Sequence, residues 1–275
     1  MKGMNMLVID AHAHIFEQRL PMVSPRRYTP DRDALLDDYL LELDRNGFSH
    51  GVLVQPSFLG FDNSYLLDAL RVCPNRLRGV VVVDTDIAEE NLLELAASGV
   101  VGVRLNLIGT ATPDFRAGPW PDFLARLRRA GLHVELTCAA AELQGLLPGL
   151  IASGNQVVVD HFGRPDGPLG MDDPGFRCLL DMGASRQVWV KLSAAYRMDL
   201  SRSSGREVVA RLAEALGLER LVWGSDWPHT HFTNRMDFAS ARQLLDDLLA
   251  DAASRHRILG ASARALFHIE DTQGR

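Results

Sequence analysis

Cysteine is scarce in this sequence, and the few cysteines present form no recognisable pattern. Cys73, Cys138 and Cys178 are odd in number, and none of them belongs to a C-x-x-C spacing. A disulfide framework calls for an even set of cysteines in a secreted chain. The cysteine content therefore predicts reduced thiols, as in the cytoplasm.

Long hydrophobic runs and an excess of basic residues are missing as well. No apolar run approaches the ~20 residues of a membrane-spanning helix, and the N-terminal MKGMNMLVID turns polar before a signal-peptide core could form. The net charge of −6 argues against a nucleic-acid or membrane-surface binder, although it leaves room for a local basic pocket. We expect a cytoplasmic protein that binds neither nucleic acid nor membrane, and a homo-oligomer is compatible with the sequence.

What the sequence does contain is a regular alternation of short apolar runs and longer segments with helical spacing. Hydrophobic residues make up 47% of the chain and charged residues 23%, which is ordinary for a globular enzyme with a sizeable core. Runs rich in Val, Leu and Ile predict eight strands. They lie at about residues 7–14, 51–57, 77–84, 100–107, 133–138, 157–162, 188–194 and 221–227.

The segments between these runs predict helices. Thr29-Pro30 offers a cap residue and a first-turn proline for the first helix, which Gly47 would close. The other predicted helices span residues 63–72, 87–98, 120–130, 140–153, 173–182, 206–216 and 238–249. Alternating strands and helices indicate parallel strands covered on both faces. Eight such units predict an α/β fold, a (β/α)8 TIM-like barrel formed by a single domain over residues 1–275, with a doubly wound open sheet as the alternative.

Polar residues of one parity interrupt the first apolar run. Asp10, His12 and His14 alternate there with apolar residues. Residues two apart on a strand point to the same side, so both imidazoles are expected on one face, which we take to be the barrel interior. One buried histidine is usually a hydrogen-bonded core residue, whereas two beside an acid indicate a functional site.

Further polar groups end the sixth and eighth runs. The sixth continues as VVVDHFGRP, in which His161 shares the parity of Val159 and Arg164 lies just beyond. The eighth ends in GSDWPH, where Asp226 has apolar neighbours and is costly to bury unless it is paired or used. The active site of a parallel barrel lies at the C-terminal ends of its strands. We therefore expect His161 and Asp226 to meet the two histidines of the first strand there.

Three motifs taken together resemble the amidohydrolase superfamily. They are H-x-H in the first strand, D-H-x-G-R-P-D after the sixth and G-S-D-W-P-H after the eighth. They keep the family's order, and the resemblance covers nearly the whole chain. It is closest to amidohydrolase-related family 2, in the branch of the 2-pyrone-4,6-dicarboxylate lactonases and related sugar-acid and aromatic-acid lactonases. The resemblance implies a (β/α)8 barrel and a hydrolase that opens a cyclic ester in aromatic-compound catabolism.

The resemblance also implies roles for individual residues. The family's catalytic positions fall on His12, His14, His161 and Asp226. Its substrate-binding positions fall on Arg104, Arg164, Arg197, Tyr28 and Ser57. In the mechanism that this implies, the aspartate activates water, the histidines polarise the carbonyl group, and the guanidinium groups bind carboxylates.

The chain departs from the resembled lactonases in two places. The loop after the fourth strand offers only a displaced Arg116 where those enzymes have a further arginine, and their strand-five tyrosine is Thr137 here. Lys191, in the seventh strand, is expected to form an ion pair.

Metal use is a separate question. Superfamily members that hold metals usually add a strand-four lysine or a strand-five histidine, whereas this chain has Arg104 in strand four, which cannot ligate a metal. The lactonase branch works without a bound metal, so we expect no cofactor. If a metal is present, His12, His14 and Asp226 could hold one zinc or similar divalent ion.

These observations lead to one principal hypothesis and two alternatives. The principal hypothesis is a hydrolase (lactonase) acting on the ring ester of a small anionic substrate, a dicarboxylate such as 2-pyrone-4,6-dicarboxylate. The first alternative is a metal-dependent amidohydrolase or decarboxylase of the same superfamily. The second is a catalytically silent barrel that binds a small acid, although a binding module has no need of a buried base such as Asp226.

Overall fold

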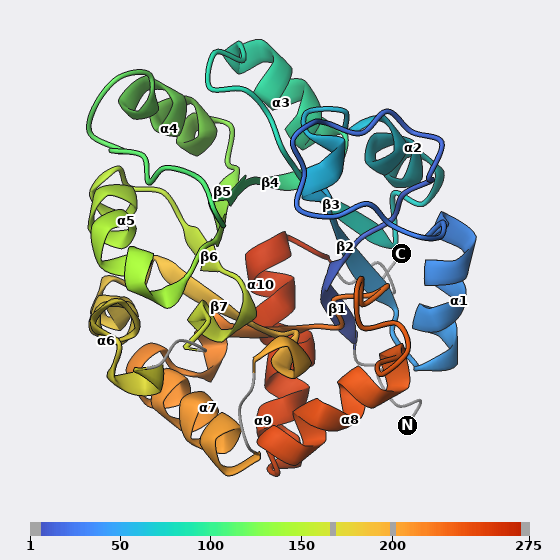
Figure 1. Ribbon diagram of the computed structural model, residues 1–275, viewed down its shortest axis with the longest axis vertical. Coiled ribbons are helices and arrows are strands. Elements are labelled where there is room, and N and C mark those ends of the chain that lie inside the picture. The colour runs from blue at the N-terminus through green and yellow to red at the C-terminus, as the bar shows by residue number, and fades with distance from the viewer. Residues whose placement is uncertain (1–6, 166–168, 199–201, 271–275) are drawn as a thin grey trace.

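The computed structural model describes residues 7–165, 169–198 and 202–270 of the chain. The expectation that the chain has no signal peptide rests partly on residues 1–6, which lie outside the described residues. The strands are β1 (Ile9–Ala13), β2 (His50–Val54), β3 (Leu77–Val81), β4 (Val100–Asn106), β5 (His133–Thr137), β6 (Val157–Val159), β7 (Val188–Ser193) and β8 (Leu221–Gly224). They form one parallel sheet in chain order, ringed by helices (Figure 1).

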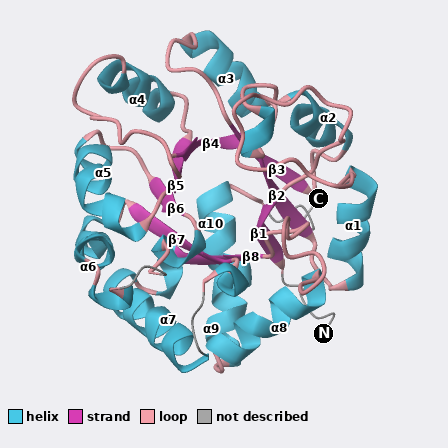
Figure 2. Ribbon diagram, viewed as in Figure 1, coloured by secondary structure: helices cyan, strands magenta, loops and turns pink. Residues whose placement is uncertain are grey.

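The helices alternate with the strands around the outside of the sheet (Figure 2). They are α1 (Leu36–Arg45), α2 (Ser64–Val72), α3 (Glu89–Ala97), α4 (Trp120–Arg129), α5 (Ala140–Ala152), α6 (Pro174–Asp181), α7 (Arg202–Leu216), α8 (Phe238–Leu248), α9 (Ala252–Arg257) and α10 (Ala263–Phe267). In the described part of the chain, no helix is long and apolar enough to cross a membrane. The sequence predicted most of these elements to within a few residues, but it did not predict α9 and α10.

The barrel is closed by contacts between its first and last strands. Ala13 and Trp227 form a parallel bridge. The amide of His14 donates to the carbonyl of Trp227 at 2.8 Å, and the amide of Asp226 donates to the carbonyl of His12 at 2.8 Å. The predicted (β/α)8 barrel is therefore confirmed, and the open-sheet alternative is wrong. The extent of the domain, expected over residues 1–275, stays a prediction.

The first helix does not begin where the sequence predicted. It begins at Leu36, so the prediction from Thr29-Pro30 is wrong. The residues before it fold back onto the loop after β1: the backbones of Phe16 and Ala34 exchange hydrogen bonds of 2.8 and 2.9 Å. The backbone groups that a longer helix would use are therefore engaged elsewhere.

Apolar residues fill the barrel at one end. Ile9, Val52, Val158 and Val222 belong to an interior cluster that also contains Phe267 of α10. Figure 1 shows α10 within the ring of strands, and it contacts both β1 and β8. This packing closes the end of the barrel where the strands begin, so polar side chains can gather only towards the C-terminal ends.

A bulge in β1 separates Asp10 from the two histidines. The pairing of β1 with β2 shifts between Asp10 and Ala13, where three steps along β1 oppose two along β2. Asp10 consequently faces outwards and accepts a hydrogen bond from Tyr39 of α1 at 3.0 Å, whereas His12 faces the interior. The prediction that Asp10 shares the side of the histidines is wrong, because a bulge inverts strand parity.

Asp10 ties β1 to the residues after β8. Its carboxylate accepts from the amide and hydroxyl of Ser225, at 2.7 and 2.6 Å, and from the amide of His12 at 3.2 Å. Burial raises the pKa of Asp10, and these hydrogen bonds lower it in part. One buried side chain thus holds both segments that carry the predicted site residues His12 and Asp226.

We predict that Asp10→Ala strongly destabilises the protein. The substitution leaves four buried donors without an acceptor, and losses of this kind cost about 3–5 kcal/mol or more in total. Urea unfolding followed by circular dichroism measures the loss. Asp86→Ala, at an exposed position before α3, is the matched control. Equal midpoints for the two variants would show that Asp10 does not hold the seam.

Candidate active site

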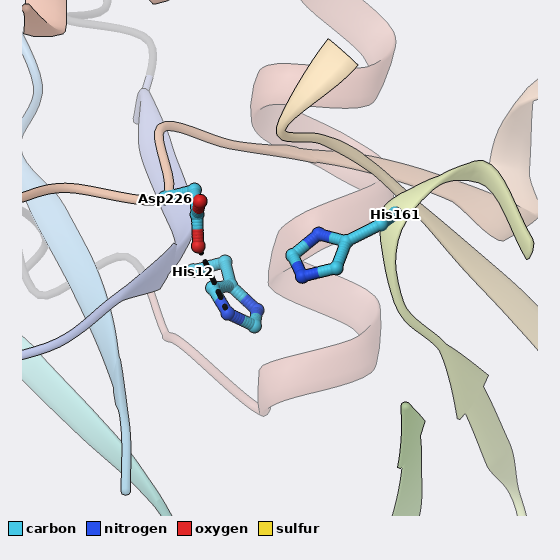
Figure 3. Close-up of side chains that lie close together, drawn as sticks. All are labelled: His12, His161 and Asp226. Atoms are coloured by element: carbon cyan, nitrogen blue, oxygen red, sulfur yellow. Dashed lines mark ion pairs between the residues drawn. The ribbon is translucent and has the colours of Figure 1, made fainter. Parts of the chain in front are cut away.

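The structure brings together the four residues that the resemblance singled out. The Nε2 atoms of His12 and His14 lie 3.3 Å apart, and they lie 3.7 and 3.6 Å from Oδ1 of Asp226. The ring centroid of His161 is 5.1 Å from that of His12. Figure 3 shows His161 approaching from beyond β6, opposite the strand that carries His12. All four groups therefore surround one point at the C-terminal ends of the strands.

His161 and Asp226 reach this point through unusual backbone conformations. Strand parity alone would turn His161 outwards, since it shares the parity of Val159, which packs in the outer core. The strand instead ends at Val159, and His161 adopts φ +53°, which swings its ring inwards. Asp226 likewise has φ +60°. Positive φ in non-glycine residues costs free energy and gathers at functional sites.

A buried ion cluster lies beneath His12. The Nζ atom of Lys191 lies 2.5 Å from Oε2 of Glu135 and 3.9 Å from Oδ1 of Asp160, and all three side chains are fully buried. The predicted ion pair of Lys191 is confirmed. Burial and the charge of Asp160 raise the pKa of Glu135, but Lys191 and two histidines lower it, and the net pKa is below its ordinary value. The pKa of Asp160 also lies well below its usual range, because His12 and Lys191 outweigh burial, so both acids are ionised.

The hydrogen-bond partners of His14 and His12 imply their tautomers. Nδ1 of His14 lies 2.7 Å from the carbonyl oxygen of Val54, which can only accept, so Nδ1 carries the proton and Nε2 is left as an acceptor. Nδ1 of His12 lies 3.2 Å from Nζ of Lys191 and 3.3 Å from Oδ1 of Asp160, so it has both a donor and an acceptor within reach. Nε2 of His12 lies 3.3 Å from Nε2 of His14, which accepts. His12 therefore presents a proton on Nε2 towards His14 and Asp226.

Asp226 is held at one oxygen and open at the other. Its Oδ2 accepts from the hydroxyl of Tyr196 at 2.6 Å and from Nε of Arg197 at 2.7 Å. Its Oδ1 faces the two histidines of β1. Burial raises the pKa of Asp226, but the charge of Arg197 and the neighbouring histidines outweigh burial and hold it well below its usual range. Asp226 is therefore an ionised carboxylate at any ordinary pH.

A cavity of about 360 Å³ opens above these groups. Its lining comes from seven loops and strand ends, and His12 lies buried beneath it. The lining residues are His14, Arg27, Tyr28, Ser57, Arg104, Thr137, His161, Arg164, Arg197, Met198, Asp226, His231 and Phe232. The five predicted substrate-binding residues all belong to this set. The cavity is rich in guanidinium groups and contains one carboxylate.

Two of the predicted substrate-binding arginines are engaged by the protein itself. Arg104 donates to the carbonyl of Gln55 at 3.0 Å and lies 3.6 Å from Asp160. Arg197 bonds Asp226 and also donates to the carbonyl of Thr230 at 3.2 Å. These arginines therefore position the site, and any carboxylate of a substrate must share them.

The two departures from the resembled lactonases have different outcomes. Thr137 lines the cavity and its hydroxyl donates to Asp160. Arg116 is exposed, lies 3.9 Å from Asp114 and takes no part in the lining. The loop after β4 therefore adds no cation to the cavity.

The donor atoms of this site fit a divalent ion. A point equidistant from Nε2 of His12, Nε2 of His14 and Oδ1 of Asp226 lies about 2 Å from each, the length of a zinc–ligand bond. His12, His161 and Asp226 also lie within 4.8 Å of one another, as do His12, Glu135 and Asp160. Lys191 already supplies a positive charge to the last of these groups. Only the sets that contain Asp226 can therefore take an ion.

Sequence reasoning missed several residues of the site. Tyr196 and Arg27 lie next to predicted residues, but nothing in their local pattern separates them from surface residues. Glu135 and Asp160 carried a signal, since acids are rare in apolar parallel strands. Their partner Lys191 could be expected to pair, but the sequence did not say with which acid.

Comparison with known proteins gives consistent results. A family model described as Amidohydrolase matches residues 9–269. The 4-sulfomuconolactone hydrolase of Rhizobium radiobacter is 31% identical over 94% of this chain and 89% of its own length. The 2-pyrone-4,6-dicarboxylate hydrolase of Comamonas testosteroni is 32% identical over 83% and 79%. A crystal structure from Pseudomonas putida, provisionally assigned as a 2-pyrone-4,6-dicarboxylic acid hydrolase, is 45% identical with a TM-score of 0.91 and covers 97% of this chain and 99% of its own.

We predict that His14 and His161 stay neutral down to about pH 5. Burial lowers the pKa of His14 to about 4 and that of His161 to about 3, and nearby acids offset burial only in part. As the pH falls, both rings should therefore take up protons only below the range of a histidine in water, near 6.5. Imidazole nitrogen shifts measured by NMR between pH 8 and 3 test this. A transition of either ring near pH 6.5 would contradict the buried, neutral site.

Proposed function

The chain belongs to the amidohydrolase family, and from that premise we propose that it hydrolyses the ring ester of a small anionic lactone. The observation that carries the proposal is an ionised, buried carboxylate, Asp226, at the floor of an arginine-rich cavity. The named activities of the relatives, which open muconolactone and pyrone rings, support the same reaction class. Among their substrates, 2-pyrone-4,6-dicarboxylate suits the charge of the cavity best.

Asp226 is the proposed general base. Its Oδ1 takes a proton from water as the water oxygen adds to the lactone carbonyl carbon, and it returns that proton to the ring oxygen when the ester bond breaks. Tyr196 and Arg197 hold Oδ2, so the reacting oxygen cannot rotate away from the substrate. The low pKa makes Asp226 a weak base, and stabilisation of the developing oxyanion has to supply the rest of the rate enhancement.

The three histidines divide into donors and an acceptor. His12 presents an Nε2 proton, and His161 can do so when Nδ1 accepts from the hydroxyl of Ser193, 2.8 Å away. These two can donate to the carbonyl oxygen as negative charge develops on it. Nε2 of His14 carries no proton and can accept, so His14 orients the attacking water. This refines the expectation that all three histidines polarise the carbonyl.

The remaining polar residues of the cavity are proposed to bind the substrate. Arg164, Tyr28 and Ser57 lie above the reacting groups, where they can contact carboxylates on the ring. Arg104 and Arg197 add positive charge from below although their hydrogen bonds are engaged. Guanidinium groups bind carboxylates in a bidentate manner, which suits a flat ring with carboxylates at its edge.

We propose that catalysis needs no metal. A divalent ion held by His12, His14 and Asp226 would polarise the carbonyl group and lower the pKa of a bound water. One observation weighs against it: the cavity already holds four guanidinium groups, which place positive charge beside the substrate. The first alternative, a metal-dependent amidohydrolase or decarboxylase, requires a bound divalent ion.

Cellular context stays a prediction. The three cysteines are free, which supports the expected cytoplasmic location. A homo-oligomer remains compatible with the sequence.

We predict that Asp226→Asn slows lactone hydrolysis by about 10²- to 10⁴-fold, because an amide keeps the shape but cannot take a proton from water. Initial rates with 2-pyrone-4,6-dicarboxylate measure the effect, and circular dichroism verifies the fold. Asp122→Asn, on the exposed side of α4, is the matched control and should keep the parental rate. Near-parental turnover in folded Asp226→Asn would move the base elsewhere. If the unmodified protein hydrolyses none of a panel of lactones, the second alternative, a catalytically silent barrel that binds a small acid, is favoured.

We also predict that removal of metals leaves hydrolysis unchanged. Protein dialysed against a strong chelator should retain its rate, since the proposed oxyanion donors belong to the chain. Metal analysis before and after dialysis verifies the removal. Loss of activity that added zinc restores would establish the metal-dependent alternative, and carbon dioxide release from an aromatic acid would identify a decarboxylase.

A further inference from the structure

The loop between β1 and α1 is a folded part of the cavity wall. The antiparallel bridge between Phe16 and Ala34 joins its two ends. Within it, the amide of Gln18 donates to Asp33 at 2.6 Å, and the side-chain amide of Gln18 donates to the carbonyl of Pro30 at 3.0 Å. A loop braced in this way can hold a side chain in one place.

The braced loop presents Arg27 and Tyr28 to the cavity. The ring of Tyr28 packs edge-on against Phe58 at 5.2 Å and against His231 at 4.8 Å between centroids. These contacts anchor Tyr28 between the loops that follow β2 and β8. Arg27, the preceding residue, lines the cavity from its exposed rim. Arg27 is exposed, whereas the carboxylate of the proposed base Asp226 is buried.

Arg27 differs from the deeper arginines in having no hydrogen-bond or ion-pair partner among the described residues. Arg197 is bonded to Asp226, and Arg104 to the carbonyl of Gln55. Arg27 makes no hydrogen bond or ion pair with any residue in the described part of the chain. Partial burial lowers its pKa, and the charges of three other cavity arginines lower it further. A guanidinium in this position is in a repulsive field that an anion would relieve.

We infer that Arg27 determines substrate specificity by binding an anionic group that the lactone carries remote from the scissile ester. This inference rests on the proposed function and adds to it: the favoured substrates carry two anionic groups, one near the floor and one at the rim. A carboxylate and a sulfonate both present at least two negatively charged oxygens that a guanidinium can bind. The solvent-exposed position lets Arg27 engage the substrate as it enters.

The test compares Arg27→Gln with Arg26→Gln. Arg26 is the adjacent exposed arginine, and it hydrogen-bonds within the loop, to Thr29 at 2.8 Å and to the carbonyl of Val23 at 3.2 Å. It therefore controls for both loss of charge and loosening of the loop. In Arg27→Gln we expect KM for 2-pyrone-4,6-dicarboxylate to rise about 10- to 100-fold with kcat little changed, as for loss of one charge-assisted hydrogen bond. KM for a pyrone monocarboxylate should change little, and Arg27→Lys should recover part of the loss.

A binding measurement separates this inference from the proposed reaction. Calorimetry of benzene-1,3-dicarboxylate and benzoate needs no hydrolysis, and Arg27→Gln should weaken only the dicarboxylate. That result would support the rim site even if no lactone were hydrolysed. Equal weakening of both acids, no weakening of either, or the same effect in Arg26→Gln would overturn the role of Arg27. If the unmodified enzyme hydrolyses lactones but Arg27→Gln binds the dicarboxylate as tightly as the parent, the proposed reaction holds and the proposed role of Arg27 is wrong.

Discussion

The pairing of Lys191 with Glu135 and Asp160 in the middle of the barrel is the interaction on which the site depends. Three charges with no exposure to water are tolerable only when they are paired, and Arg104, 3.6 Å from Asp160, adds the second positive charge. Removal of one partner from such a group costs about 3–5 kcal/mol. The same ammonium lies 3.2 Å from Nδ1 of His12, and Oδ1 of Asp160 lies 3.3 Å from that nitrogen, so the cluster holds the imidazole ring in place. The buried ion cluster thus orients a residue one layer above it.

The seam between β1 and β8 is the second constraint. It joins the strand that carries His12 and His14 to the turn that carries Asp226, through backbone hydrogen bonds and the buried carboxylate of Asp10. A bulge in β1 makes this possible, since it turns Asp10 outwards to grip Ser225 while His12 remains inside. Positive backbone φ values at His161 and Asp226 complete the convergence. The surrounding barrel supplies the stability that such strained residues need.

The charge of the cavity opposes the charge of the whole protein. The chain carries −6, yet four arginines and one aspartate line the cavity. Because field lines concentrate in a cleft with low-dielectric walls, the local sign governs which ligands enter. The arginines also serve two purposes: Arg104 and Arg197 hold the loop backbone and Asp226 in place, and Arg27 at the rim is the proposed binding group for an anion. The arginines of the cavity therefore contribute both to the geometry of the proposed catalytic residues and to the choice of substrate.

The sequence by itself determined the (β/α)8 barrel and the four central residues. Its recurring apolar runs, the spacing of His12 and His14, and the acid and histidine at two strand ends are all local features, and local spacing is what a sequence displays. Tertiary structure decided what depends on distant partners. His12 meets Lys191 across 179 positions, Asp10 meets Ser225 across 215, and Arg27 reaches the cavity only because its loop folds back over β1. The early start predicted for α1 and the parity assigned to Asp10 were wrong for the same reason: a long-range hydrogen bond or a bulge outweighed the local pattern.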